Sequence, residues 1–469
     1  MSETKPYIQA LFAGKNISVN SNRASIFEEF AKDENITVAV KQILENQKML
    51  TDKWTLINRV RDIKEQPVSI PNATVGKPYE ALVDFDQLHW RDVTNSDFEG
   101  LDTVGLCYDC ETKVISGTPT RSGDLKVTFK YKVEGEPEDS ALNEKLIPIV
   151  INPDPKSLWK NIESVKTDYY WKEDNITAFE RLGDKTLVAA SKRGRSHANV
   201  GSFREDDLAY KYFESTGWSV VAVADGAGSA KMSRQGSKIA CNSIVDYFSN
   251  HLTEESFSDF DILLKEYVES KGEETQKKLN YFVYNTLGQA ALYAHKQLDA
   301  FATKDETPIK ELHSTLIFTL FKKYEYGYAI LSFGVGDCPI GLINKDLSSV
   351  TLMNWLDVGE FGGGTRFITM PDIFKSEKFY TRFNFKLIDD FSFLMLMTDG
   401  IYDPKFVVEA NLEKMEKWQE LLNDLNGENE DGVKVEFNRG NADIASQLSD
   451  WMDFWSSGNH DDRTLAIIF

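Results

Sequence analysis

The stretch WSVVAVADGAGSA, Trp218–Ala230, reads as a buried strand that ends at a carboxylate. Six of its first seven residues are apolar, as expected for a strand covered on both faces. Asp225 and Gly226 follow at once, and glycine lets the backbone turn sharply there. A carboxylate in this position is held by a rigid element and can still reach solvent or a cation.

The same arrangement recurs along the chain. Apolar strands are expected before Gly336-Asp337, before Asp399-Gly400 and after Asp461-Asp462, and a further one, Leu187–Ser191, precedes a loop that reaches Glu205-Asp206-Asp207. If these strand ends meet, the crowded carboxylates raise each other's pKa, and a hard dication would relieve the crowding. An all-oxygen site favours Mg²⁺ or Mn²⁺. Because an isolated Asp-Gly is usually a hairpin turn, spacing leaves a shared site and separate turns both open.

Composition excludes several classes of protein. The chain has 469 residues, which predicts two or three domains, and 41% of them are apolar, which excludes a fully disordered chain. A net charge of −21 disfavours binding to nucleic acid or anionic membranes, which requires clustered Lys and Arg. We therefore expect neither partner.

The N-terminus and the cysteines predict a cytoplasmic protein. MSETKPYIQALF lacks the basic and apolar regions of a secretory signal, and no apolar run approaches the roughly 18 residues of a membrane helix. Cys107 and Cys110 form a single C-x-x-C with no second pair, which disfavours a structural zinc site. With Cys241 and Cys338 they are interpreted as reduced thiols.

Four regions are expected from changes in sequence pattern. Residues 1–63 are predicted to be helical, residues 64–155 to form an all-β sandwich, residues 156–184 to be a charged linker, and residues 185–469 to form an α+β domain. The 26–63 stretch has no Gly or Pro, and its apolar face is expected to pack on a neighbour or partner. The acidic stretch Glu409–Gly440 is expected to be a partly helical, solvated insertion.

Six segments of the C-terminal region resemble, in order, the motifs of the metal-dependent protein phosphatases (type 2C, the PPM family), and the bacterial subgroup most of all. They are SHANVGSFREDD, VVAVADGAGSA, HSTLIFTL, FGVGDCPIGLI, FLMLMTDGIYD and HDDRTLAIIF. The resemblance implies an α-β-β-α sandwich, with two antiparallel sheets flanked by helices. In residues 64–155, GLCYDCETKVISGTPTRSGDLKVTF is similar to bacterial Ig-like repeats.

The phosphatase resemblance implies hydrolysis of phosphoserine and phosphothreonine in proteins by water activated by two Mn²⁺ or Mg²⁺ ions. The family motifs map to catalytic Asp225, Asp399 and Asp461 and to further metal ligands Glu205, Asp206 and Gly226, while Asp337 and Asp403 correspond to the residues that hold a weaker third ion. Asp462 stands where the closing motif has Asn. A phosphoprotein substrate, a cognate kinase, and a protein partner for the N-terminal modules are implied as partners.

Three positions depart from the family pattern. Ala227 replaces a histidine proposed as general acid in animal members, and Gly201 stands where a phosphate-binding arginine usually lies. Arg195, His197 and Arg204 are candidates to replace that arginine, each weighed against an ordinary surface charge. The glycines at 362–364 fall where the family has a mobile flap.

Two other functions remain open. The same fold occurs as inactive phosphatases that serve as adaptors, which the N-terminal modules would suit. Another metal-dependent phosphomonoesterase, acting on a small molecule, is the second alternative.

Overall fold

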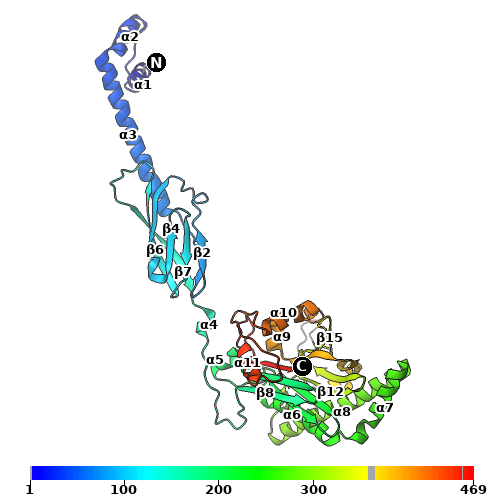
Figure 1. The fold of residues 1–469 in the computed structure, drawn as a ribbon. Helices are drawn as coiled ribbons and strands as arrows, with labels where there is room; N and C mark the ends of the chain where they lie inside the picture. The colour runs from blue at the N-terminus through cyan, green and yellow to red at the C-terminus, as the bar shows by residue number, and fades with distance from the viewer. Residues whose placement is uncertain (1–2, 358–364, 457) are drawn as a thin grey trace. The chain divides into compact units, whose positions relative to one another are not determined.

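The structure is a computed structural model that describes residues 3–357, 365–456 and 458–469. The glycines at 362–364 lie outside the described residues. The chain divides into two compact units, Met1–Leu158 and Trp159–Phe469 (Figure 1). Among the described residues, no helix combines the length and the apolar composition that crossing a bilayer would require.

The first unit begins with three helices, α1 (Thr4–Gly14), α2 (Ala24–Lys32) and α3 (Glu34–Glu65). Asp33 caps α3 by accepting hydrogen bonds from the backbone N–H groups of Asn35 and Ile36. A small apolar cluster holds the three helices together, with Ile8 of α1, Phe27 of α2 and Val40 of α3 buried in it. The predicted helical segment is therefore a helical hairpin packed on one end of a long helix (Figure 1).

Two antiparallel β-sheets complete the first unit, apart from one parallel pair, β1–β7. Their strands are β1 (Ala73–Thr74), β2 (Tyr79–Leu82), β3 (Val93–Glu99), β4 (Leu106–Asp109), β5 (Val114–Gly117), β6 (Gly123–Val133) and β7 (Asn143–Asn152), and the short α4 (Pro155–Leu158) follows. One sheet has the order β1-β7-β6-β3 and the other β2-β5-β4. Both contribute to one core, where Trp90 stacks on Phe129 and where Ile63 of α3 is fully buried.

The second unit contains two larger sheets in which all pairs of strands are antiparallel. Their strands are β8 (Asn175–Leu182), β9 (Lys185–Lys192), β10 (Asp207–Phe213), β11 (Trp218–Ala224), β12 (Leu316–Tyr324), β13 (Gly327–Val335), β14 (Ile340–Asn344), β15 (Val350–Leu352), β16 (Phe383–Ile388), β17 (Phe391–Met397) and β18 (Arg463–Ile468). One sheet has the order β10-β11-β12-β13-β16, and the other has the order β15-β14-β17-β18-β9-β8.

Helices cover the outer face of each sheet. They are α6 (Ser233–His251), α7 (Glu254–Ser270), α8 (Glu273–Lys304), α9 (Asp399–Phe406), α10 (Met415–Leu425) and α11 (Ile444–Trp451). The short α5 (Arg195–Val200) lies between β9 and β10 in the chain and buries none of its residues. One core lies between the five-stranded sheet and α6–α8, another between the six-stranded sheet and α9–α11, and a third between the two sheets. The layer order is helix, sheet, sheet, helix, as the resemblance implied.

Two expectations from the sequence were wrong. Residues 175–182 are not part of a linker, because they form the edge strand β8, which pairs along its length with β9. Their charged side chains fit an edge position that is exposed on one side. The acidic stretch Glu409–Gly440 is not simply a solvated insertion, because one face of α10 buries Trp418, Leu421 and Leu425 in the core.

Candidate metal centre

Several strand ends bring carboxylates to one place between the two sheets. Asp225 follows β11, Asp337 follows β13, Asp399 begins α9 directly after β17, and Asp461 lies just before β18. The carboxylate oxygens of Asp225 and Asp337 lie within 4.8 Å of each other. The structure therefore brings together acidic groups that are far apart in the chain, as a shared site requires.

Asp225 is held by its backbone rather than by its carboxylate. Its N–H donates to the Thr315 hydroxyl over 2.8 Å, and the Thr315 N–H donates to the Asp225 carbonyl over 2.8 Å. The next residue, Gly226, has no room for a side chain, because a Cβ there would lie 2.7 Å from the Glu205 carbonyl oxygen. Burial raises the pKa of the Asp225 carboxyl well above its usual range, and the neighbouring Asp399 adds to the effect.

Asp206 is buried, with one carboxylate oxygen bonded and the other free of protein donors. Its Oδ2 accepts hydrogen bonds from the hydroxyls of Thr398 and Thr464, each over 2.8 Å. Its Oδ1 has no hydrogen-bond partner among the described residues. Burial, with a contribution from the nearby Asp462 charge, raises the pKa of Asp206 to about 7. The two threonines thus orient the free oxygen toward the cluster.

Three more buried carboxylate oxygens lack hydrogen-bond partners among the described residues: Glu205 Oε2, Asp337 Oδ1 and Asp399 Oδ1. Leaving such a group buried and unpaired costs free energy unless a proton or a cation satisfies it. Burial raises the pKa of each of these three carboxyls, to about 7 for Glu205. Together with Asp206 they form a set of hard oxygen donors that fits Mg²⁺ or Mn²⁺.

Asp462 differs from its neighbours because both of its oxygens are occupied by protein donors. Oδ1 accepts from the Gly194 N–H over 2.6 Å and lies 2.9 Å from His197 Nδ1, while Oδ2 accepts from the Glu205 N–H. Burial alone would raise the pKa of Asp462, but these donors and the His197 charge hold it below its usual value. Asp462 therefore connects β18 to the loops after β9 and before β10, whereas the adjacent Asp461 is exposed.

Of the three candidates for phosphate binding, His197 lies nearest the carboxylates. Its Nε2 is 3.8 Å from Glu205 Oε2. Burial opposes its charge, but Asp462 and the other carboxylates outweigh burial and raise the pKa of His197 to about 9. Arg195 donates to the Asp453 carbonyl and lies over the ring of Trp455.

Arg204 is an interior residue. Only 1% of it is exposed, and its guanidinium donates to the carbonyls of Glu173 and Asp206 and to the Ser191 hydroxyl. Because these partners occupy it, we leave Arg204 out of the phosphate site that we propose below. Its role in the structure is to hold the loop that carries Glu205 and Asp206.

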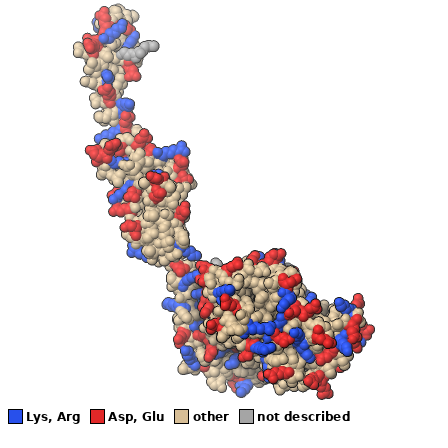
Figure 2. Space-filling view, in the orientation of Figure 1, with Lys and Arg blue, Asp and Glu red and all other residues tan. Residues whose placement is uncertain are grey.

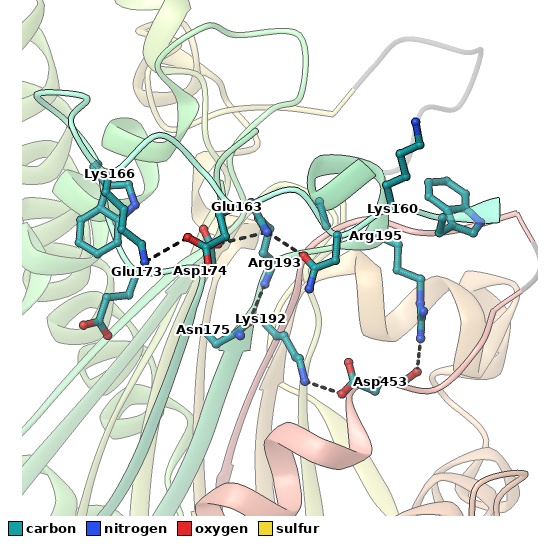
Figure 3. Close-up of a pocket in the computed structure, with 14 residues that line it drawn as sticks. Lys160, Glu163, Lys166, Glu173, Asp174, Asn175, Lys192, Arg193, Arg195 and Asp453 are labelled. Carbon is teal, nitrogen blue, oxygen red and sulfur yellow. Dashed lines mark hydrogen bonds and ion pairs between the residues drawn. The ribbon is translucent and has the colours of Figure 1, made fainter. Parts of the chain in front are cut away.

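Figure 3 shows the residues that line a cavity of about 530 Å³, which α5 borders and which is distinct from the carboxylate cluster by its lining. Arg195 and Ala198 of α5 line it, together with Lys160 and Trp159. None of the clustered carboxylates lines the cavity. Figure 3 shows its other basic side chains held by acidic or polar neighbours, for example Lys192 by the Asp453 carboxylate at 2.7 Å.

Lys172 supports the cluster and was missed by the sequence analysis. Its ammonium is buried and donates to the Asp206 carbonyl over 2.7 Å and to the Asp207 carboxylate over 3.0 Å. It lies in the stretch that was expected to be a linker, and no local pattern distinguishes it from a surface lysine. Thr398 and Thr464 could have been found, because each lies next to or near a motif aspartate.

The sequence profile of the protein phosphatase 2C family matches residues 193–452, more than half of the chain. The chain belongs to the protein phosphatase 2C family. Comparison with curated protein sequences gives no match.

Several solved structures are similar to this family member at low identity. The catalytic domain of the serine/threonine phosphatase PstP, with two manganese ions, is 13% identical, with a TM-score of 0.36 and coverage of 60% of this chain and 96% of that one. RsbX with magnesium is 13% identical (TM-score 0.34, coverage 62% and 98%), and Stp1 from Staphylococcus aureus is 12% identical (TM-score 0.33, coverage 66% and 98%). The predicted cofactors, Mn²⁺ or Mg²⁺, are the ions that the first two of these structures contain.

Proposed function

We propose that this protein phosphatase 2C family member is an active, metal-dependent protein serine/threonine phosphatase. The observation that carries the proposal is the group of four buried carboxylate oxygens, on Glu205, Asp206, Asp337 and Asp399, that accept no hydrogen bond from any described residue. A fold that only binds a partner has no physical reason to bury unpaired acidic groups at this cost. A site that binds divalent cations does.

The residues that would hold two ions are those that the family motifs identified. The two ions would be held by Asp225, Asp399, Asp461, Glu205 and the Gly226 carbonyl. Asp206 would contribute directly or through water, and Asp337 and Asp403 would hold a weaker third ion. When bound, such ions lower the pKa of a water molecule for attack on phosphorus and neutralise phosphate oxygens.

The protein's own groups would orient this chemistry. Thr398 and Thr464 fix the free oxygen of Asp206, and Asp462 holds the His197 ring in place. A protonated His197 beside Glu205 would offer a cation to the substrate phosphate, or a proton to the departing serine or threonine oxygen. This would replace two groups that the chain lacks, since Ala227 and Gly201 occupy the positions of the family histidine and arginine.

The first unit is proposed to serve recognition rather than catalysis. Residues 64–155 would be an Ig-like module, and with the helical segment 1–63 they would bind a protein partner. The substrate would be a phosphoprotein, and a cognate serine/threonine kinase would be its source.

The test is Mn²⁺-dependent hydrolysis of a phosphothreonine peptide by the full chain. Asp225→Asn and Asp399→Asn should each lower turnover at least a hundredfold. Asp390→Asn serves as the matched control, because Asp390 also flanks a strand but pairs with Lys185 and Lys345. Equal turnover in wild type and Asp225→Asn would refute the assignment.

Two measurements separate the alternatives. Calorimetric titration with Mn²⁺ should show tight binding, and absence of both binding and turnover would instead indicate an adaptor. A small phosphate ester hydrolysed far better than any phosphopeptide would indicate a small-molecule phosphomonoesterase.

A further inference from the structure

The middle of α3 is exposed to solvent on all its faces. Every residue from 45 to 55 is exposed, which amounts to three helical turns. Within this stretch the Gln47 side-chain amide donates a hydrogen bond to the Tyr7 hydroxyl of α1 over 3.4 Å. The N-terminal end of the helix is covered by α1 and α2, and the C-terminal end packs on the β-sheets through Leu56, Val60 and Ile63. A helix of this kind would ordinarily be polar all round.

This helix is not polar all round. Ile43, Leu50, Trp54 and Ile57 have exposed fractions of 40%, 64%, 66% and 52%. Their spacing of seven, four and three residues places them on one face, as in the seam of a coiled coil. We call these four residues the α3 seam. Gln47 lies on the same face, at the position where a polar residue often sets the register of a coiled coil.

We propose that the α3 seam pairs with the α3 seam of a second copy of this chain, in parallel and in register. In that arrangement Gln47 faces the same residue of the partner subunit, and two side-chain amides can bond to each other. An antiparallel pair centred on Leu50 would place Gln47 against a tryptophan and leave its amide only the long hydrogen bond to the Tyr7 hydroxyl, at 3.4 Å. The polar residue therefore favours the parallel pair.

The size of the seam matches a reversible dimer. The exposed parts of its four side chains amount to on the order of 500 Å² for each copy, or about 1,000 Å² for a pair, near the lower limit for a specific interface. Both helices are already formed, so pairing does not require the cost of folding them. We expect a dissociation constant in the micromolar range, since area near this limit supports only modest affinity.

Neighbouring parts of the first unit leave the seam open. The sheets pack on the side of α3 that carries Leu56, Val60 and Ile63, away from the seam. The flanks carry no opposed like charges, because Asn46 would face Thr51 and Lys53 would face Asn58 across a parallel pair. Charged residues of both signs lie along the rest of the helix (Figure 2).

Sedimentation velocity of the full chain tests the proposal, from about 1 to about 100 µM, around the expected dissociation constant. Wild type should convert from monomer to dimer with concentration. The double variant L50E/W54E should weaken association at least tenfold, because it places charges on the seam. Met49→Glu is the matched control, since Met49 is also well exposed, at 56%, but lies on another face of the same turn, and it should leave dimerisation unchanged.

A cross-link tests the register. In a chain with Cys107 and Cys110 replaced by serine, Leu50→Cys should form a disulfide between copies under mild oxidation, because equivalent residues meet in a parallel pair. Met49→Cys in the same background should not. Circular dichroism checks that each variant keeps its helices. A monomer at all concentrations, as expected if a different protein covers this face, or a dimer insensitive to L50E/W54E, would overturn the proposal.

Discussion

Replacing Asp225 with Asn should raise the melting temperature of the metal-free protein and abolish its response to divalent cations. Carboxylate oxygens of Asp225 and Asp337 lie within 4.8 Å of each other. Two unit charges at that separation repel by about 3 kcal/mol at an effective dielectric constant of 20. This value is an upper limit, because protons already neutralise part of the charge when burial raises the pKa of both groups.

The sign follows from that shift. An acid whose pKa is raised in the folded state loses stabilising protonation as pH rises, whereas asparagine does not titrate. The advantage of Asp225→Asn in metal-free buffer should therefore grow as the pH rises above about 4, the ordinary pKa of aspartate. At its maximum it corresponds to a melting temperature on the order of 5 °C higher.

Cation binding should reverse the order. At a Mn²⁺ concentration about a hundredfold above the dissociation constant, wild type gains about 2.7 kcal/mol, and the variant should gain little of this. Differential scanning calorimetry with chelator and with Mn²⁺ measures both effects. Asp390→Asn is the control and should melt slightly lower than wild type in both buffers while keeping the Mn²⁺ shift. An Asp225→Asn variant that melts below wild type in chelator, or shifts equally with Mn²⁺, would refute the reasoning.

Three further predictions concern the second unit. Gly400→Ala should destabilise the protein by about 2 kcal/mol or more and lower turnover, because the new Cβ would lie 1.9 Å from the Asp462 carbonyl oxygen; thermal melts and activity assays check this. His197→Gln should lower turnover with a phosphopeptide roughly a hundredfold while keeping the Mn²⁺ melting shift, and loss of that shift would instead indicate a structural role. Asp390 contributes stability that should be lost as the pH falls below about 4, because, against the effect of burial, Lys185 lowers the pKa of Asp390 to about 2. Between about pH 4 and pH 2, wild type should therefore lose about 1 kcal/mol more of its free energy of unfolding than Asp390→Asn, a value reduced for solvent exposure, as acid titration of stability would measure.

The strands and their carboxylate ends could be predicted from local pattern. The apolar run Trp218–Ala224 forms β11 with those bounds, and Asp225 follows it as expected. Such runs are interpretable because burial on both faces demands apolar side chains whatever the neighbouring strands are. The order of the motifs along the chain was also sufficient to indicate the family.

The role of each acidic or basic residue could not be predicted in the same way. Asp461 and Asp462 are adjacent in sequence, yet one is exposed and the other is fully bonded by donors from Gly194 and Glu205. Arginine is usually a surface residue, yet Arg204 is buried in the interior. The two backbone donors to Asp462 lie 268 and 257 residues away in the chain, and the Arg204 guanidinium reaches a carbonyl 31 residues away.

The α3 seam shows the same division. Its apolar residues are visible in the sequence, but their spacing there is mixed with that of residues that pack on α1 or on the sheets. Chain-local sterics and hydrophobicity specify helices, strands and turns, and so these features follow from the order of amino acids. Which carboxylates lack a partner, and which helix face stays open, depends on distances between segments that meet only when the chain folds, because hydrogen bonds and charge interactions act across a few ångströms of space.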